Sequence, residues 1–108
     1  MSSNKDYEDE IVELDELKIT KISPKLKEEL EKFKSLKRLS LIACDVRSLD
    51  NFPNLASLEE LDFADNKIKG DELTKLPNLA NLRSLCLSSN LINSVQDLKS
   101  LTKFNKTI

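Results

Sequence analysis

Apolar residues recur along this chain in one fixed order, which is more complex than the alternation of an ordinary strand. The order is leucine-x-x-leucine-x-leucine-x-x-asparagine-x-leucine, in which other residues replace some leucines. Four copies are predicted: a weak one at Leu14, Leu17, Ile19, Ile22 and Pro24; then Leu36, Leu39, Leu41, Cys44 and Val46; Leu58, Leu61, Phe63, Asn66 and Ile68; and Leu82, Leu85, Leu87, Asn90 and Ile92. We number the positions of each copy from its first leucine.

The spacing of the copies indicates the fold class. Their first positions, residues 14, 36, 58 and 82, are 22, 22 and 24 residues apart, and a period of about 20 to 29 residues with this pattern is typical of leucine-rich repeats. Parallel strands lie about 4.8 Å apart while the bulkier return segments need more room, so the stack curves. We predict an α/β leucine-rich repeat solenoid with a curved parallel sheet on its concave face. Irregular or 3₁₀ return segments are expected on its convex face.

The ninth position holds a polar residue within an otherwise apolar pattern. Where the chain leaves each strand, backbone N–H and C=O groups turn inward without a partner, and burying such a group costs about 1 to 3 kcal/mol. An amide side chain donates and accepts hydrogen bonds at once. We therefore expect Asn66 and Asn90 to be buried structural residues that bond the backbone, and Cys44 to be a small buried thiol in the same place.

The two ends of the repeat array are expected to be covered differently. Residues 1–13 form an acidic N-terminal cap or, alternatively, a disordered acidic arm; residues 14–103 hold four repeats, and residues 104–108 begin an incomplete fifth. At the C-terminal edge three alternatives are open. Leu98, Leu101 and Phe104 fold back as a lid, a second molecule covers the edge by self-association, or the chain is a piece of a longer repeat protein.

Side chains at the third, fifth and seventh positions are expected to point out of the sheet, because strand side chains alternate. The candidate partner-binding residues on or beside this concave face are Lys18, Arg38, Ser40, Glu60, Asp62, Asp65, Ser84 and Cys86. Glu60, Asp62 and Asp65, with neighbouring Glu59, form a carboxylate patch beside the basic Arg38 and Lys37, which suits a protein partner with charges of both signs. The alternative is that the patch is only solvated.

Charge is arranged in stripes although its sum is small. The whole chain carries −2, with residues 1–16 at −6, residues 18–38 at +5 and residues 59–72 at −4. Such a sum gives no overall attraction to nucleic acid or to an anionic membrane, and no apolar run is long enough to cross a bilayer. We expect an intracellular protein, nuclear and/or cytoplasmic, that neither binds nucleic acid directly nor inserts into a membrane.

The composition argues against the commonest catalytic chemistry. There is no histidine and a single glycine, Gly70, which excludes histidine acid–base chemistry and a glycine-rich phosphate loop. We predict no enzyme activity, no cofactor and no metal site. Cys44 and Cys86 stand two repeats apart, roughly 10 Å by strand spacing, too far for a disulfide, and are expected to be free thiols. Gly70 is interpreted as a structural residue with positive φ at the start of the longer return segment.

The run from Phe33 to Leu101 resembles the acidic leucine-rich nuclear phosphoprotein family. The more specific likeness lies in "LDFADNKIKG", which is similar to that family's leucine-x-leucine-serine-aspartate-asparagine stretch ending in glycine, and in the longer repeat that follows. The resemblance implies a right-handed solenoid that binds proteins, with histones or chromatin and a phosphatase catalytic subunit, which it inhibits, as partners. Relative to the family, this sequence is expected to be shortened and without the acidic tail.

We therefore predict a non-catalytic protein–protein interaction module that uses its concave sheet. The alternative is a structural leucine-rich repeat subunit of a ribonucleoprotein or splicing complex, which grips an RNA-binding protein rather than RNA. A capture experiment with histones, a phosphatase catalytic subunit and RNA-binding domains would distinguish these two functions.

Overall fold

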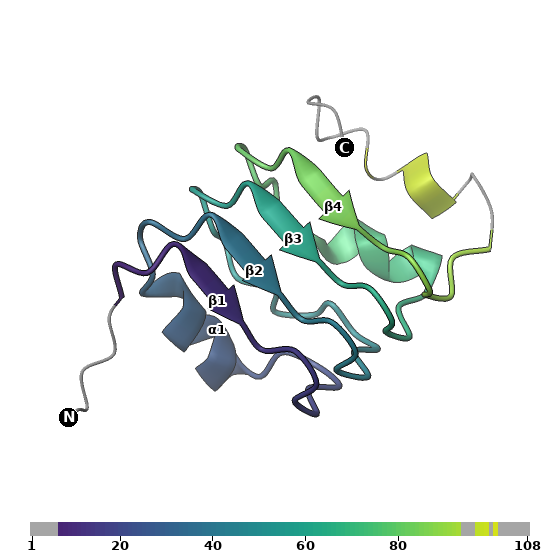
Figure 1. Cartoon of the computed structure of the whole chain (residues 1–108). Helices are drawn as coiled ribbons and strands as arrows, with labels where there is room; N and C mark the ends of the chain where they lie inside the picture. The colour runs from purple at the N-terminus through teal and green to yellow at the C-terminus, as the bar shows by residue number, and fades with distance from the viewer. Residues whose placement is uncertain (1–6, 94–96, 100, 102–108) are drawn as a thin grey trace.

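The computed structural model describes residues 7–93, 97–99 and 101. Its elements are β1 (Ile11–Glu13), α1 (Pro24–Glu31), β2 (Arg38–Ser40), β3 (Glu60–Asp62), the 3₁₀ helix η1 (Gly70–Lys75) and β4 (Ser84–Cys86). The four strands form one parallel sheet in the order β1-β2-β3-β4. Figure 1 shows the strands side by side, with α1 and the teal-green η1 in the return segments behind the sheet. The predicted class, a mixed α/β leucine-rich repeat stack with 3₁₀ return segments, is confirmed.

The register of the sheet follows the repeat pattern. Leu39 of β2 pairs with Leu61 of β3, which pairs with Leu85 of β4. All three hold the fourth position, so equivalent leucines lie above one another and point into the same interior. This alignment explains how short strands of three residues hold together, because each strand adds one complete apolar layer to the stack.

The interior is filled by branched aliphatic side chains from the second and third repeats. The apolar residues of these two copies are almost fully buried: Leu36, Leu39, Leu41, Cys44, Val46, Leu58, Leu61, Phe63 and Ile68. Return segments contribute Phe52, Leu73 and Leu79 to the same cluster, and Phe52 meets Phe63 edge to face with ring centroids 5.9 Å apart. Packing of successive layers on each other is therefore the main source of stability.

The predicted alignment of the first repeat was wrong. Ile11 pairs with Arg38, 27 residues further along the chain, so Val12, Leu14, Leu17 and Ile19 hold the fourth, sixth, ninth and eleventh positions. The first strand thus lies inside the segment predicted to be a cap. The predicted alignment placed every residue of this copy five residues too late, because the return segment of the first repeat is longer than that of the others.

The extra length of the first return segment is used to form α1. Ser23 caps the helix by accepting a hydrogen bond from the Leu26 backbone N–H at 3.0 Å, and Pro24 stands in the first turn, where its missing N–H costs nothing. Leu26, Leu30 and Phe33 recur at helical spacing and face the core. A helix therefore replaces the irregular segment that was expected.

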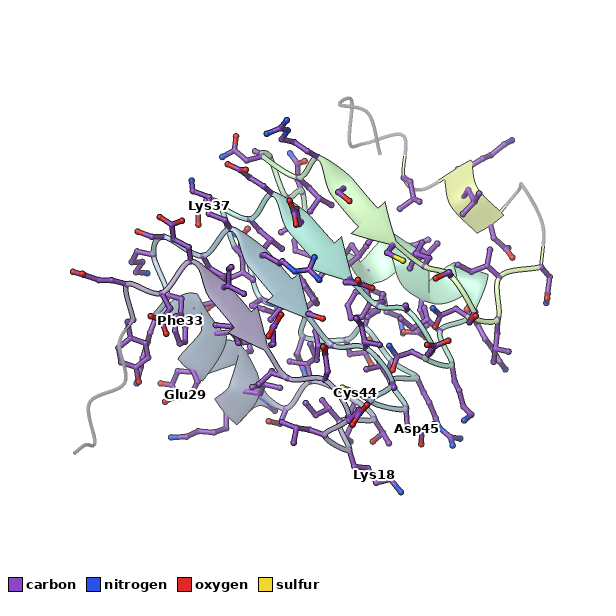
Figure 2. The ribbon with its side chains drawn as sticks, viewed as in Figure 1. Lys18, Glu29, Phe33, Lys37, Cys44 and Asp45 are labelled. Carbon is purple, nitrogen blue, oxygen red and sulfur yellow. The ribbon has the colours of Figure 1, made fainter. Side chains whose placement is uncertain are left out.

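Tyr7 packs over this end of the molecule. Its ring meets Phe33 edge to face at 5.0 Å, and its hydroxyl donates to Glu29 at 2.9 Å. Figure 2 shows Phe33 and Glu29 together on the α1 side. Tyr7 therefore joins the segment that precedes β1 to α1 and to Phe33.

Gly70 has a different role from the one predicted. No glycine in the described chain has positive φ, so the left-handed conformation proposed for Gly70 is wrong. A Cβ at this position would overlap the Cβ and Cγ atoms of Asp97, while Asp97 also accepts a hydrogen bond from the Asn93 N–H at 3.2 Å. Glycine is needed here because it leaves room for Asp97 beside the start of η1.

Two of the three residues proposed as a C-terminal lid fall within the described chain. Leu101 is half-buried against the core, whereas Leu98 is exposed. Phe104 lies outside the described residues. In the same described part of the chain, no helix has both the length and the apolar character needed to span a membrane.

Candidate protein-binding face

The outer face of the sheet carries side chains that the core does not use. The side chains at the third and fifth positions of the four strands are together called the outer sheet face. These are Ile11, Arg38, Glu60 and Ser84 in one row, and Glu13, Ser40, Asp62 and Cys86 in the next. Because parallel strands in register bring equivalent residues together, each row is a ladder of neighbouring side chains.

Arg38 lies at the centre of this face and joins two carboxylates of the next strand. Its guanidinium is 3.3 Å from a Glu60 oxygen and 3.6 Å from an Asp62 oxygen. The Glu60 side chain remains 53% exposed, whereas that of Asp62 is 18% exposed. Exposed pairs of this kind stabilise a fold by at most about 1 kcal/mol. These charges therefore remain available to a partner at little cost to folding.

A second charged ladder runs along the second position, just before the strands. Lys37 is 3.5 Å from Glu59, and Glu59 is 3.7 Å from Arg83. Glu10 holds the same position in the first repeat, so the charge alternates in sign from one repeat to the next. This ladder widens the charged surface beyond the outer sheet face.

Ser40 was predicted to contact a partner, but it is not accessible. The side chain is fully buried, and its hydroxyl donates to an Asp15 carboxylate oxygen at 2.6 Å. The same oxygen accepts the Ile42 backbone N–H at 2.8 Å. Asp15 thus fastens the end of the first strand to the second and covers Ser40.

Lys18 also lies away from the predicted surface. It follows β1 by five residues and sits in the turn, where its side chain extends away from the strands (Figure 2). The true outward residues of the first repeat are Ile11 and Glu13, which the sequence interpretation missed. The signal for them was present, since shifting the weak copy by five residues places Val12 and Leu14 on core positions.

The remaining predicted contact residues are exposed or partly exposed. Ser84 is exposed on β4, and Cys86 is half-buried with its thiol 3.3 Å from the Ser88 hydroxyl. Asp65 lies beyond β3 in the turn, with a positive φ of 60°. The structure thus brings Arg38, Glu60 and Asp62 into one constellation and leaves Asp65 at its border.

The ninth-position residues hold the turns beneath this face, as predicted. Asn66 is buried; its amide nitrogen donates to Leu41 O and Phe63 O at 2.8 Å each, and its oxygen accepts from Cys44 N at 3.0 Å and Val46 N at 2.8 Å. One side chain therefore ties two successive repeats together.

Asn90 and Cys44 repeat this arrangement with fewer bonds. Asn90, half-buried rather than buried, donates to Phe63 O at 2.9 Å and accepts from Ile68 N at 3.0 Å. Cys44 donates its thiol proton to Leu14 O at 3.0 Å, and burial raises the pKa of this thiol. Both cysteines are free, as predicted.

Acidic and thiol side chains do not gather into a metal site in the described chain. No group of three or more cysteine, aspartate or glutamate residues there is placed to hold an ion. On the outer sheet face, the carboxylates of Glu60 and Asp62 are instead paired with Arg38.

Comparison with other proteins shows which proteins are similar to this chain. A protein from Tetrahymena thermophila that is named as a histone is 35% identical over 105 residues, which are 97% of this chain and 27% of that protein. An acidic leucine-rich nuclear phosphoprotein 32-related protein from Plasmodium falciparum is 31% identical over 97 residues, 88% of this chain and 34% of that protein. The acidic leucine-rich nuclear phosphoprotein 32-related protein 1 of Oryza sativa subsp. japonica is 45% identical over 74 residues, 67% of this chain and 15% of that protein.

This chain belongs to the acidic leucine-rich nuclear phosphoprotein 32-related family. The predicted resemblance is thereby confirmed. No protein-family model matches the chain. The chain spans 34% or less of the length of the relatives named above. The likeness therefore concerns the repeat region.

Proposed function

We propose that this phosphoprotein 32-related chain is a non-catalytic module that binds a basic protein through its outer sheet face. The observation that carries the proposal is the constellation of Arg38, Glu60 and Asp62 on neighbouring strands. Its carboxylates outnumber its cation, and Glu13 adds a further exposed carboxylate on β1. A partner rich in lysine and arginine fits this balance, because complementary charge speeds encounter and fixes register.

The size of the face determines which further residues take part. Four strands at about 4.8 Å spacing are only about 14 Å across, whereas a stable interface buries about 800 Å² on each partner. The second-position ladder, with Lys37, Glu59 and Arg83, lies next to the strands and supplies additional area. The partner therefore contacts both the outer sheet face and the segment that precedes it.

Histones are the basic partner that the relatives' names favour. One relative is itself named a histone, and others are named nuclear phosphoproteins. A nuclear location and histone binding are consistent with an acidic face. Phosphatase inhibition and assembly with an RNA-binding protein are the other functions to be distinguished by experiment.

Charge reversal on the outer sheet face tests this function. The double substitution Glu60→Lys and Asp62→Lys is expected to weaken capture of purified core histones by at least about tenfold, roughly 1.4 kcal/mol, because it replaces attraction by repulsion. A matched control, Glu28→Lys with Asp71→Lys, changes the net charge equally at exposed sites on α1 and η1. Binding is measured by titration, and folding by circular dichroism.

Three results would contradict the proposal. Equal loss of binding in the control variant would mean that only net charge matters. Unchanged histone binding in the Glu60→Lys, Asp62→Lys variant would remove the outer sheet face from the interface. Selective capture of a phosphatase catalytic subunit or an RNA-binding domain, with no affinity for histones, would contradict the proposed partner.

A further inference from the structure

The outer edge of β1 offers backbone groups that no described residue uses. In a parallel sheet, the backbone groups of alternate residues point to the same side. On the β2 side, Glu10 O accepts from Arg38 N at 3.0 Å, and Leu14 N donates to Ser40 O at 2.8 Å. The N–H and C=O groups of Ile11 and Glu13 therefore point away from the sheet. β1 is the terminal strand on this side.

Within the part of the chain that the structure describes, the apolar layer behind this edge is covered on one side only. Leu14 and Ile19 are half-buried, whereas Leu41 and Val46, which hold the same positions in the second repeat, are fully buried. The contrast is larger at the ninth position, where Leu17 is 53% exposed and Cys44 is 1% exposed. One further layer of apolar side chains would give the first repeat the same burial as its neighbours.

The chain segment that carries β1 has charges of one sign. Between Tyr7 and Leu17 there is no basic residue, while six carboxylates are present: Glu8, Asp9, Glu10, Glu13, Asp15 and Glu16. Asp9, Glu10, Glu13 and Glu16 are exposed. Ile11, on the outer sheet face at this edge, is 57% exposed. A segment that docks here must carry positive charge as well as apolar side chains.

We propose that β1 binds an extended segment of a partner protein by strand addition, and that this segment alternates basic and branched aliphatic residues. Its backbone pairs with Ile11 and Glu13. Because strand side chains alternate, its aliphatic residues cover Leu14 and Leu17 while its basic residues lie on the other face, next to Glu13. This mode of recognition takes affinity from backbone hydrogen bonds and specificity from alternate side chains. The site shares Glu13 with the outer sheet face but does not use Arg38, Glu60 or Asp62.

A proline substitution tests the backbone part of the proposal. Proline removes an N–H and is tolerated on an edge strand where that N–H faces solvent, so Glu13→Pro removes one outward donor without touching the β1–β2 bonds. Glu13→Gln is its matched control, since it removes the same charge and keeps the N–H. The probe is a blocked peptide of alternating lysine and valine, whose binding is followed by amide chemical shifts.

The wild-type chain is expected to bind this peptide with shifts at residues 11–17. Glu13→Gln should weaken binding by about twofold, as for one exposed charge, and Glu13→Pro by about tenfold, because a hydrogen bond is lost as well. The Glu60→Lys, Asp62→Lys variant should bind the peptide like the wild type, which separates this site from the proposed histone-binding face.

A change in the peptide keeps the test valid even if Glu13→Pro does not fold. The same peptide with N-methylated valines cannot donate backbone hydrogen bonds from those residues and should lose its affinity for wild-type protein. Equal binding of the methylated and unmethylated peptides would overturn the proposal, as would equal affinities of folded Glu13→Pro and Glu13→Gln. Shifts confined to the outer sheet face of β3 and β4 would overturn it too.

Discussion

Among the described residues, the second repeat is packed between two neighbours, whereas the first repeat has a neighbour on one side only. Leu41 and Leu14 hold the same position in the two repeats, yet Leu41 is fully buried and Leu14 is half-buried. The backbone shows the same difference, because β2 is paired on both edges and β1 on one. Stability in this molecule therefore depends on position in the stack more than on residue type.

The turns at the ninth position of the two repeats also differ in how their backbone N–H groups are bonded. Between the second and third repeats, the Asn66 side chain supplies the acceptor for Val46 N at 2.8 Å. Between the first and second repeats, Cys44 has no side-chain oxygen, and its backbone carbonyl accepts Ile19 N at 3.0 Å instead. In the first turn, the N–H group of Ile19 is therefore bonded to a backbone carbonyl, and no asparagine side chain is needed to accept its hydrogen bond.

The largest expected effect comes from shortening the two equivalent leucines. Leu41→Ala should lower the free energy of unfolding by about 4 kcal/mol, because it leaves a cavity between two packed layers. Leu14→Ala should cost about 2 kcal/mol, since the half-buried site loses less contact. Urea denaturation of both variants measures the difference. Equal losses would mean that the first repeat is packed as tightly as the second.

A smaller effect is expected at the two asparagines. Asn66→Ala should cost about 3 kcal/mol, because the buried N–H groups of Cys44 and Val46 lose their acceptor. Asn90→Ala should cost about 1 kcal/mol, since Asn90 is partly exposed and water can replace its bonds. The same denaturation experiment gives both values, and a larger loss for Asn90→Ala would contradict the layered account.

The repeat pattern was sufficient to predict the sheet, its parallel strands and the burial of Asn66. It was not sufficient to align the first repeat, because the pattern contains two similar sets of gaps. Leu14, Leu17, Ile19 and Ile22 match the first, fourth, sixth and ninth positions, while Val12, Leu14, Leu17 and Ile19 match the fourth, sixth, ninth and eleventh. Only strand pairing, which joins Ile11 to Arg38, distinguishes these alternatives.

The candidate face was predicted in part for the same reason. Arg38, Glu60 and Asp62 belong to the well-aligned repeats, and their positions on the sheet were correct. Lys18 was misplaced with the first repeat, and the burial of Ser40 depends on Asp15, whose position the misalignment concealed. Gly70 was misinterpreted because its constraint comes from Asp97, a contact made through the fold rather than along the chain.

Hydrogen exchange at individual backbone amides tests the difference between the closed and open layers most directly. The amides of Cys44 and Val46, bonded to buried Asn66, are expected to exchange only through global unfolding. The amides of Ile11 and Glu13 should exchange within about tenfold of the rate of an unstructured chain, because they point away from the sheet. Protection of Ile11 and Glu13 equal to that of Val46 would contradict the account.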